Sequence, residues 1–449
     1  MISIVFPNGL YADLREKLLL ESPREAAAVL LAGRETRDDS ERLMIREVVW
    51  LPPNAYTVQH ACQLNIKPEF IAAPLKRAHK EGWSLVIVHS HPDSIAPNFS
   101  ASDDDGERLL MPSVFARAPE RPHASLIVGK KGFKARVWFP NNPQMVTVDK
   151  LLEVGPDVKI HGKSFHEAVA PEYDRSVKAF GHDGQVILSK LTVGIIGLGG
   201  TGSIIAEQLA HLGVGRFIFL DPDVIEVTNL NRVVGSTFES VGTPKVDVAA
   251  RYVSRIRPNA AVETHFGSVL EKRYARAMLS SDFMFCCTDS HGSRAIFNQI
   301  AYQYFIPGID LGIRIDVTNK KVESVSGRVQ MVAPGLPCLV CQNIIDPHEV
   351  RRDLFSEEER QHDPYLTGFR EPQPAVVSLN GTVASQAVTM MLGAVTGFPF
   401  KTRHQVFLSD QGIVRSVESS QDPECIVCSL KGAFGRGDLQ PLPWRETAS

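Results

Sequence analysis

Short apolar strands and amphipathic helices alternate over residues 191–304, and this alternation restricts the possible folds more than any other feature of the chain. Strand–helix–strand repeats are typical of parallel strands joined by crossover helices, so they predict a doubly wound parallel sheet. The expected strands are 191–197, 216–221 and 283–289, and the expected helices are 201–213, 245–256, 293–304 and, after a charged crossover at 348–364, the apolar segment 375–395.

A smaller α/β unit is expected before this sheet, in residues 1–140. The chain has 449 residues, which is enough for two or three domains. In this unit we expect a helix at 67–82, strands at 84–92, 124–129 and 134–139, and a buried strand or helix at 26–33. Residues 141–170 carry scattered proline, glycine and charge and are predicted to be a linker, and residues 433–449 are predicted to be a flexible tail.

The composition excludes several classes of protein. Apolar residues make up 43% and charged residues 22%, which is typical of a folded chain with a core in each domain. The net charge of −3 provides no basic excess for a nucleic-acid partner. No apolar run approaches the roughly 18–20 residues that span a bilayer, and the N-terminus lacks a basic segment followed by an apolar one. We therefore expect a cytoplasmic protein with neither a membrane nor nucleic acid as partner.

Two histidines that flank one serine indicate a metal site in the first unit. His89 and His91 are expected on a strand, where residues i and i+2 point to the same side and can reach one ion. Asp103 follows, with Ser100 three residues before it. Two histidines and one carboxylate leave the fourth tetrahedral position of zinc open for water. Such a site still needs a general base, and Glu25 is the candidate.

These residues, with a proline after His91 and a Pro-Arg sequence before Glu25, resemble the JAB/MPN (JAMM) metallopeptidases. The resemblance covers residues 1–140. It implies zinc on His89, His91 and Asp103, with Ser100 steadying the tetrahedral intermediate and Glu25 moving protons. Without this context, two strand histidines are more often ordinary core or surface residues.

One spacing departs from that family. Eight residues separate His91 from Ser100, one more than the family usually has. Ser102 and Asp105 are therefore a shifted alternative to Ser100 and Asp103. Inactive relatives also occur in this family, so a binding scaffold with a dead site is a second interpretation of the unit.

A glycine-rich turn follows the first strand of the second unit. It spans residues 197–202, where glycines allow close approach to a phosphate and a helix N-terminus offers free N–H groups. Asp221 ends the next strand, where a carboxylate can hold a ribose hydroxyl. Alone, these features predict a Rossmann-like nucleotide fold, for which a dehydrogenase is the plainest function. The glycines are Gly197, Gly199, Gly200 and Gly202.

The polar residues that follow favour adenylation over hydride transfer. Adenylation builds charge on the α-phosphate and on the leaving pyrophosphate, where cations and a Mg²⁺-binding carboxylate are stabilising. Transfer of a hydride to or from NAD has no use for such groups. The residues are Asp223, Asn229, Arg232, Lys245 and Asp289.

The motifs over residues 171–432 together resemble the ThiF/MoeB/HesA and ubiquitin-activating enzyme superfamily. They occur in the family's order, at 173–185, 194–203, 220–232, 243–247 and 288–294. The resemblance implies ATP and Mg²⁺ as cofactors and a homodimer. It also implies that Arg175 reaches the partner's ATP, Asp221 binds ribose, Asn229, Arg232 and Lys245 contact phosphates, and Asp289 serves Mg²⁺.

Two Cys-x-x-Cys pairs predict a second zinc site. Cys338, Cys341, Cys425 and Cys428 supply the four thiolates of a tetrahedral structural site. Because the pairs are far apart in the chain, the ion would clip two distant segments together. Four unrelated buried thiols are the alternative.

Many relatives carry a further cysteine in the crossover, which accepts the activated carboxylate as a thioester. Here residues 342–424 contain no cysteine. Cys286 and Cys287 lie in an apolar strand and are expected to be core residues. Cys62 has no evident role. We therefore expect the activated substrate to stay an acyl-adenylate, with Cys287 the least implausible exception.

The two resemblances share one kind of substrate, a small β-grasp protein with a glycine-ended tail. They imply a bacterial-type fused enzyme that cleaves after the terminal glycine of a ubiquitin-like protein and adenylates the exposed carboxylate. A conjugating-type enzyme is the expected next partner. The alternative is a sulfur carrier that is activated for thiocarboxylate formation in cofactor or cysteine synthesis.

Overall fold

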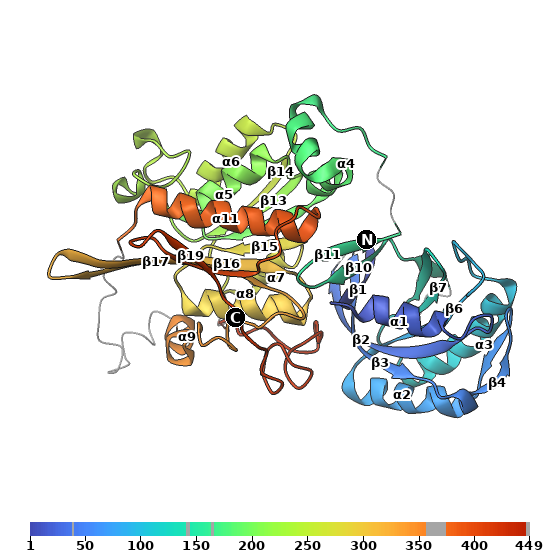
Figure 1. Cartoon of the computed structure of the whole chain (residues 1–449). Helices are drawn as coiled ribbons and strands as arrows, with labels where there is room; N and C mark the ends of the chain where they lie inside the picture. The colour runs from blue at the N-terminus through green and yellow to red at the C-terminus, as the bar shows by residue number, and fades with distance from the viewer. Residues whose placement is uncertain (38–39, 141–143, 163–165, 356–373, 446–449) are drawn as a thin grey trace. The chain divides into compact units, whose positions relative to one another are not determined.

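The computed structural model describes residues 1–37, 40–140, 144–162, 166–355 and 374–445, which form two compact units (Figure 1). The N-terminal unit comprises residues 1–164 with 303–305 and 433–440, and the C-terminal unit comprises 165–302, 306–432 and 441–449. No helix in the described part of the chain combines the length and apolar character that crossing a bilayer requires.

The N-terminal unit is built on a nine-stranded mixed sheet. Its strand order is β11-β10-β1-β3-β2-β6-β7-β8-β9, and β4 and β5 form a separate hairpin. The strands are β1 (Ile2–Pro7), β2 (Ala27–Arg37), β3 (Ser40–Trp50), β4 (Tyr56–Gln59), β5 (Leu64–Ile66), β6 (Ser84–Ser90), β7 (His123–Val128), β8 (Phe133–Trp138), β9 (Met145–Thr147), β10 (Lys150–Val154) and β11 (Val158–His161), and the helices are α1 (Leu10–Leu19), α2 (Pro68–Glu81) and α3 (Ala101–Arg117).

Two apolar cores sandwich this sheet. One packs Tyr11, Leu14 and Leu18 of α1 against the strands, and the other packs residues of α2 and α3 against the opposite face. The middle strands β2 and β6 are buried on both faces, which explains their near-continuous apolar sequences. The predicted helix at 67–82 and the predicted strands at 84–92, 124–129 and 134–139 are confirmed.

The N-terminal unit extends beyond residue 140, where the sequence predicts a linker. Within that stretch β10 pairs in parallel with β1, and β11 pairs antiparallel with β10. The reason is a short alternating pattern in β10, where Leu151 and Glu153 are buried and Lys150 and Leu152 are only partly buried. Residues 433–440, expected in a flexible tail, also belong to this unit, where they make backbone hydrogen bonds and Ala433 is buried.

The C-terminal unit has an eight-stranded sheet in the order β14-β13-β12-β15-β16-β17-β18-β19. The strands are β12 (Thr192–Ile196), β13 (Arg216–Asp221), β14 (Ala261–Phe266), β15 (Phe283–Cys286), β16 (Gly308–Thr318), β17 (Lys321–Val332), β18 (His404–Leu408) and β19 (Ile413–Ser416), and the helices are α4 (Asp174–Lys190), α5 (Gly200–His211), α6 (Lys245–Ile256), α7 (Lys272–Met278), α8 (His291–Gln303), α9 (Pro347–Leu354) and α11 (Val377–Val395).

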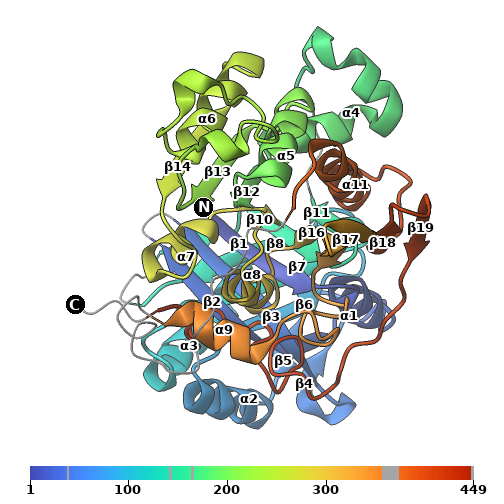
Figure 2. The same ribbon diagram turned by 90° about the vertical axis from the view of Figure 1, so that its left-hand side faces the viewer.

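The half of this sheet from β14 to β16 is parallel, as predicted, and helices cover both of its faces (Figure 1, Figure 2). Helices α5 and α11 lie side by side on one face, and α8 lies on the other. The half from β16 to β19 is antiparallel and was not predicted, because hairpins replace the strand–helix rhythm there. Of the predicted crossover, residues 356–364 lie outside the described part.

The strand order places a topological switch point between β12 and β15. Chain connections from β12 run outward to β13 and β14, and β15 pairs on the other side of β12. In open α/β sheets, ligands bind at such a point, beyond the carboxyl ends of the strands.

Candidate active sites

The histidine pair lies at the end of the central strand β6. Ser90, between the two histidines, is fully buried, and its Oγ accepts the N–H of Ala26 at 3.0 Å. Its backbone N–H donates to the carbonyl of Ala26 at 2.9 Å. Because Ser90 points into the core, His89 and His91 both point the other way. Their Nε2 atoms lie 3.1 Å apart.

The first turn of α3 brings the carboxylate to the histidines. Asp103 Oδ1 lies 3.1 Å from Nε2 of His89, and Oδ2 lies 3.5 Å from Nε2 of His91. Ser100 caps the helix, since its Oγ accepts the N–H of Asp103 at 3.1 Å and its own N–H donates to the Asp103 carboxylate at 2.6 Å. This reciprocal capping box fixes Asp103 at the helix N-terminus.

The shifted register is not the one that the structure assembles. Asp105 is exposed and pairs with Arg108 at 2.6 Å, on the surface of α3. Ser102 lines the same cavity as His89 and Asp103, but Ser100 is the serine that caps α3 and hydrogen-bonds Asp103.

Glu25 stands next to the histidine pair. Its Oε1 lies 3.7 Å from Nε2 of His91. Its backbone is held on both sides, by its N–H donating to the carbonyl of His60 and by Gln59 Nε2 donating to its carbonyl at 2.9 Å. Burial raises the pKa of its carboxyl group. Glu25 is therefore fixed beside the candidate ligands without being one of them.

The donor set fits a zinc ion. One ligand atom from each of His89, His91 and Asp103 lies within 4.8 Å of the others. Two imidazoles and one carboxylate match the protein ligands of catalytic zinc and leave a position for water. A cavity of about 640 Å³ adjoins the site, between α2, α3 and the β4–β5 hairpin; Cys62, Leu64, Ile71, Leu75 and Leu109 contribute to its lining.

The second candidate site is a cavity of about 540 Å³ at the switch point of the C-terminal sheet. It holds most of the predicted nucleotide residues in one place. Those that line it are Gly197, Gly199, Gly200, Asp221, Asp223, Arg232, Lys245 and Asp289.

The glycines of this turn are required for two different reasons. Gly197 has a φ of +90°, which other residues rarely adopt. A side chain on Gly202 would collide with the carbonyl oxygen of Gly197, so Gly202 serves close packing beneath the turn and does not line the cavity.

Hydrogen bonds link Asp221, Asp223 and Lys245 in the wall of the cavity. Buried Asp221 accepts the N–H of Leu198 at 2.6 Å and of Asp223 at 2.8 Å, and burial raises the pKa of its carboxyl group. Lys245 Nζ donates to Asp223 Oδ2 at 2.7 Å. The carboxylate at the end of β13 thus also ties the glycine-rich turn to the loop that presents Asp223.

Besides Gly202, two predicted residues lie outside the cavity. Asn229 is buried in a turn, where its Oδ1 accepts the N–H of Glu226 at 2.7 Å. Arg175 is exposed on α4. Its predicted role concerns a second copy of the chain and stays a prediction.

The cavity also contains residues that sequence reasoning missed. Arg294 follows Asp289 on α8, and its Nε donates to buried Asp310 at 3.1 Å. Asp353 of α9 accepts the N–H of Gly292 at 2.9 Å, at the start of α8. Asn380 comes from α11. Arg294 is the last residue of the motif at 288–294 but received no role there, whereas Asp353 and Asn380 lie outside the motifs, and folding brings them from separate segments.

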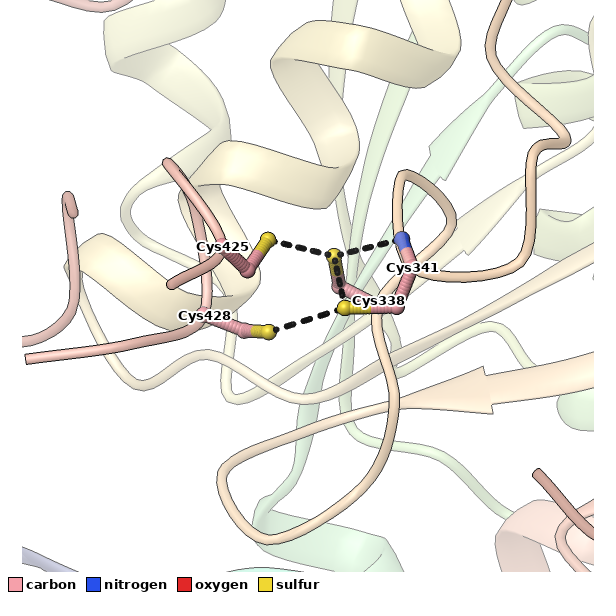
Figure 3. A group of neighbouring side chains, drawn as sticks. All are labelled: Cys338, Cys341, Cys425 and Cys428. Carbon is pink, nitrogen blue, oxygen red and sulfur yellow. Dashed lines mark hydrogen bonds between the residues drawn. The ribbon is translucent and has the colours of Figure 1, made fainter. Parts of the chain in front are cut away.

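The four cysteines of the two Cys-x-x-Cys pairs converge in the C-terminal unit (Figure 3). Sγ of Cys338 lies 3.6 Å from Sγ of Cys341 and of Cys425, and Sγ of Cys341 lies 3.4 Å from Sγ of Cys428. All four are free thiols. Zn–S bonds of about 2.3 Å place tetrahedral sulfurs about 3.8 Å apart, so the cluster fits a structural zinc ion.

Protein contacts position both cysteine pairs. The N–H of Leu339 donates to Oδ1 of buried Asn298 on α8 at 2.9 Å. Gln421 Nε2 donates to the carbonyl of Leu336 at 2.7 Å, which joins the two segments beside the cluster.

Comparisons with known proteins agree with the two units. The ThiF family model matches residues 173–427, more than half of the chain, and a model of prokaryotic homologues of the JAB domain matches residues 7–140.

Two curated relatives illustrate the similarity. Ubiquitin-like modifier-activating enzyme 5 of Drosophila willistoni is 27% identical over 181 residues, which are 36% of this chain and 43% of that protein. tRNA threonylcarbamoyladenosine dehydratase of Bacillus subtilis (strain 168) is 38% identical over 91 residues, which are 20% of this chain and 36% of that protein. The chain thus spans less than half the length of these relatives.

Among solved structures, E. coli MccB crystallised with ATP aligns with a TM-score of 0.47 and 21% identity, covering 59% of this chain and 76% of that chain. With the cavity at the switch point and the family match over residues 173–427 both in place, we conclude that this chain belongs to the ThiF family and carries a JAB domain ahead of its ThiF part.

Proposed function

We propose that the ThiF part adenylates the C-terminal carboxylate of a ubiquitin-like β-grasp protein, and that the JAB domain cleaves after that protein's terminal glycine. The observation that carries the proposal is the cavity at the switch point, where a glycine-rich turn meets two cations, Arg232 and Lys245, and the carboxylate of Asp289. A glycine-rich turn suits many nucleotides, but this charge pattern suits the departure of pyrophosphate.

In the proposed reaction, a carboxylate oxygen of the substrate attacks the α-phosphorus of ATP. An acyl–phosphate bond forms, the bond to the β-phosphate breaks, and pyrophosphate leaves. Arg232 and Lys245 stabilise the charge on the departing group, and the N-terminus of α5 faces the phosphates. Mg²⁺, when bound at Asp289, supplies further neutralisation of the phosphates.

In the JAB domain, His89, His91 and Asp103 would hold zinc. A zinc ion bound there lowers the pKa of water toward neutrality. Glu25, fixed beside His91, takes a proton from the water and delivers it to the leaving amine. Ser100 is the N-cap of α3; its hydroxyl caps the helix and donates to the Asp103 carboxylate at 2.7 Å, and in the proposed reaction this same hydroxyl steadies the tetrahedral intermediate beside Asp103.

The relatives named as ubiquitin-like modifier-activating enzymes support the substrate class. We propose further that the Cys338 cluster holds structural zinc, that the chain acts as a homodimer, and that a conjugating-type enzyme receives the activated protein. Sulfur-carrier activation remains the second candidate, because residues 342–424 offer no cysteine for a thioester.

The test uses the full chain and a β-grasp protein with a glycine-ended tail. That protein should stimulate ATP–pyrophosphate exchange in the presence of Mg²⁺, and Lys245→Ala and Asp289→Ala should each abolish the stimulation. Absence of exchange by the wild type with every glycine-ended β-grasp protein of the same genome would refute the adenylation.

For the hydrolase, the same protein extended by a peptide after its terminal glycine is the substrate. His89→Ala should lose zinc and cleavage, and Glu25→Gln should keep zinc and lose cleavage by roughly 10²–10⁴-fold. Asp105→Ala is the matched control and should cleave normally, because Asp105 pairs with Arg108 on the surface. Normal cleavage by Glu25→Gln would show that another group moves the proton.

A further inference from the structure

Asn380 is a buried amide in the wall of the nucleotide cavity, and nothing so far gives it a role. It lies in the first turn of α11, and 6% of its surface is exposed. Within the residues that the structure describes, its side chain has no hydrogen-bond partner. Buried amides are normally paired, because burying an unpaired donor costs free energy. An unpaired amide that faces a cavity is therefore available to a ligand.

The side chain of Asn380 lies directly on the phosphate-binding turn. A Cβ added to Gly200, the first residue of α5, would collide with Nδ2 of Asn380. The same Cβ would lie 3.4 Å from Cδ of Arg232. Asn380 and Arg232 thus flank one glycine at the helix N-terminus, and they can serve the same phosphate groups.

Helix α11 is held firmly against α5, the helix that begins at this turn (Figure 1). Gln208 Nε2 of α5 donates to Ser385 Oγ of α11 at 2.8 Å. Val383 and Ala384 of α11 are buried, with Val383 against Gly327 of β17, so the helix also packs on the sheet. The amide of Asn380 is therefore preorganised over Gly200 before any nucleotide binds, and donors placed in advance bind developing charge most effectively.

We propose that Asn380 donates its side-chain N–H to the β- and γ-phosphates of ATP, next to Arg232, and so binds the group that leaves as pyrophosphate. This inference rests on the proposed function only in requiring that ATP binds in this cavity. It extends the site to α11, a helix that follows the crossover in sequence and carries no recognised nucleotide motif.

The experiment measures Mg²⁺-dependent binding of ATP, inorganic pyrophosphate and AMP to the full chain, without any protein substrate. Asn380→Ala should weaken ATP and pyrophosphate binding roughly tenfold, as expected for a hydrogen bond to a charged group. It should leave AMP binding nearly unchanged. Asn380→Asp keeps the shape and adds a negative charge, so it should weaken ATP binding more than the alanine variant does.

Thr382→Asp is the matched control. It introduces the same charge on the same helix, two residues further on, at an exposed position outside the cavity. It should bind ATP nearly as the wild type does. Because Asn380 has no protein partner to lose, the melting temperature of Asn380→Ala without nucleotide should match that of the wild type.

The possible results separate the two proposals. ATP and pyrophosphate binding that is the same in Asn380→Ala, Asn380→Asp and wild type would overturn the role of Asn380 alone. An equal loss of AMP binding in Asn380→Ala would overturn the assignment to the β- and γ-phosphates. Wild type that binds ATP but shows no exchange with β-grasp proteins would overturn the proposed function and leave this inference standing.

Discussion

At the scale of single residues, Cys287 lies where a cysteine that forms a thioester would be needed. Its thiol, however, does not ionise readily enough to act as the nucleophile. It lines the nucleotide cavity just after β15, at the carboxyl end of the sheet. Burial raises the pKa of its thiol, so the thiolate is scarce at neutral pH. Neighbouring Cys286 is fully buried, and burial raises the pKa of its thiol as well. The geometry therefore favours an activated substrate that stays an acyl-adenylate.

The expected result is that no thioester forms on the enzyme. After incubation with ATP, Mg²⁺ and the β-grasp protein, a non-reducing gel should show no thiol-sensitive adduct, and Cys287→Ser should keep full ATP–pyrophosphate exchange. A thiol-sensitive band in the wild type that disappears in Cys287→Ser would contradict this expectation.

Glu41 links the stability of the N-terminal unit to pH. It is 4% exposed on β3, and burial raises its pKa from 4.5 to about 7, while a hydrogen bond from Thr36 opposes the shift. A carboxyl group whose folded pKa is raised stabilises the fold fully below pH 4.5, and this contribution is lost as pH rises through about 7. Between these two pH limits the free energy of unfolding falls by up to about 3 kcal/mol.

Glu41→Gln should remove this pH dependence. Above pH 8 the variant should be more stable than the wild type by up to about 3 kcal/mol, and near pH 5 the two should be similar. Urea unfolding followed by tryptophan fluorescence measures this, because Trp50, Trp83 and Trp138 all lie in the N-terminal unit. Equal stability of the two proteins at pH 8 would show that ionisation of Glu41 does not lower the free energy of unfolding.

At the scale of elements, the segment 433–440 belongs to the N-terminal unit although it comes from the other end of the chain. The N–H of Asp438 donates to the carbonyl of Arg34 at 2.7 Å, and Gly437 forms a parallel bridge with Arg34. Gly437 has a φ of +55°, and a Cβ there would collide with the carbonyl oxygen of Arg34. The segment thus lies beside the end of β2, beyond the residues that pair with β6, and the close approach there requires a glycine.

Gly437→Ala should destabilise the N-terminal unit through both strain and collision. Gly9→Ala is the matched control, because Gly9 has a φ of +75° with open space around it. The control should lose about 1 kcal/mol from backbone strain alone, and Gly437→Ala should lose at least twice as much. Urea unfolding of both variants measures the difference, and equal losses would mean that the segment does not dock tightly.

At the scale of the whole molecule, the two metal sites are expected to be independent. The wild type should contain two zinc ions per chain by elemental analysis, and His89→Ala and Cys425→Ser should contain one each. His89→Ala should lose cleavage and keep exchange, because the two activities are assigned to different units. Loss of both ions in either variant would contradict independent sites.

The exposed Arg175 on α4 provides a test of the proposed homodimer. Arg175→Ala should have severely reduced exchange if its guanidinium stabilises the partner's phosphates, since such an arginine contributes roughly 10³-fold or more in GTPases. Mixing Arg175→Ala with Lys245→Ala protein should restore part of the activity, because mixed dimers contain one intact site. Full exchange by Arg175→Ala alone would exclude the role.

The α/β class of both units and the parallel half of the second sheet could be predicted from the sequence, as could most of the residues that gather at the two candidate sites. Local physics carries that information. The turn at 197–202 needs glycines wherever it occurs, and two histidines on one strand face one side. The spacing of Ser100 and Asp103 left the register of the carboxylate open, because Ser102 and Asp105 fit the same pattern.

The tertiary structure brings Asp103, and not Asp105, next to the histidine pair, because this depends on how the first turn of α3 docks against the end of β6. It also placed Asn380 over Gly200 and Arg294 against Asp310. It drew 144–161 and 433–440 into the N-terminal unit. These contacts join residues far apart in the chain, and a pairing across such separations leaves no periodic trace in the sequence. The burial that makes each one favourable exists only once the sheets have formed.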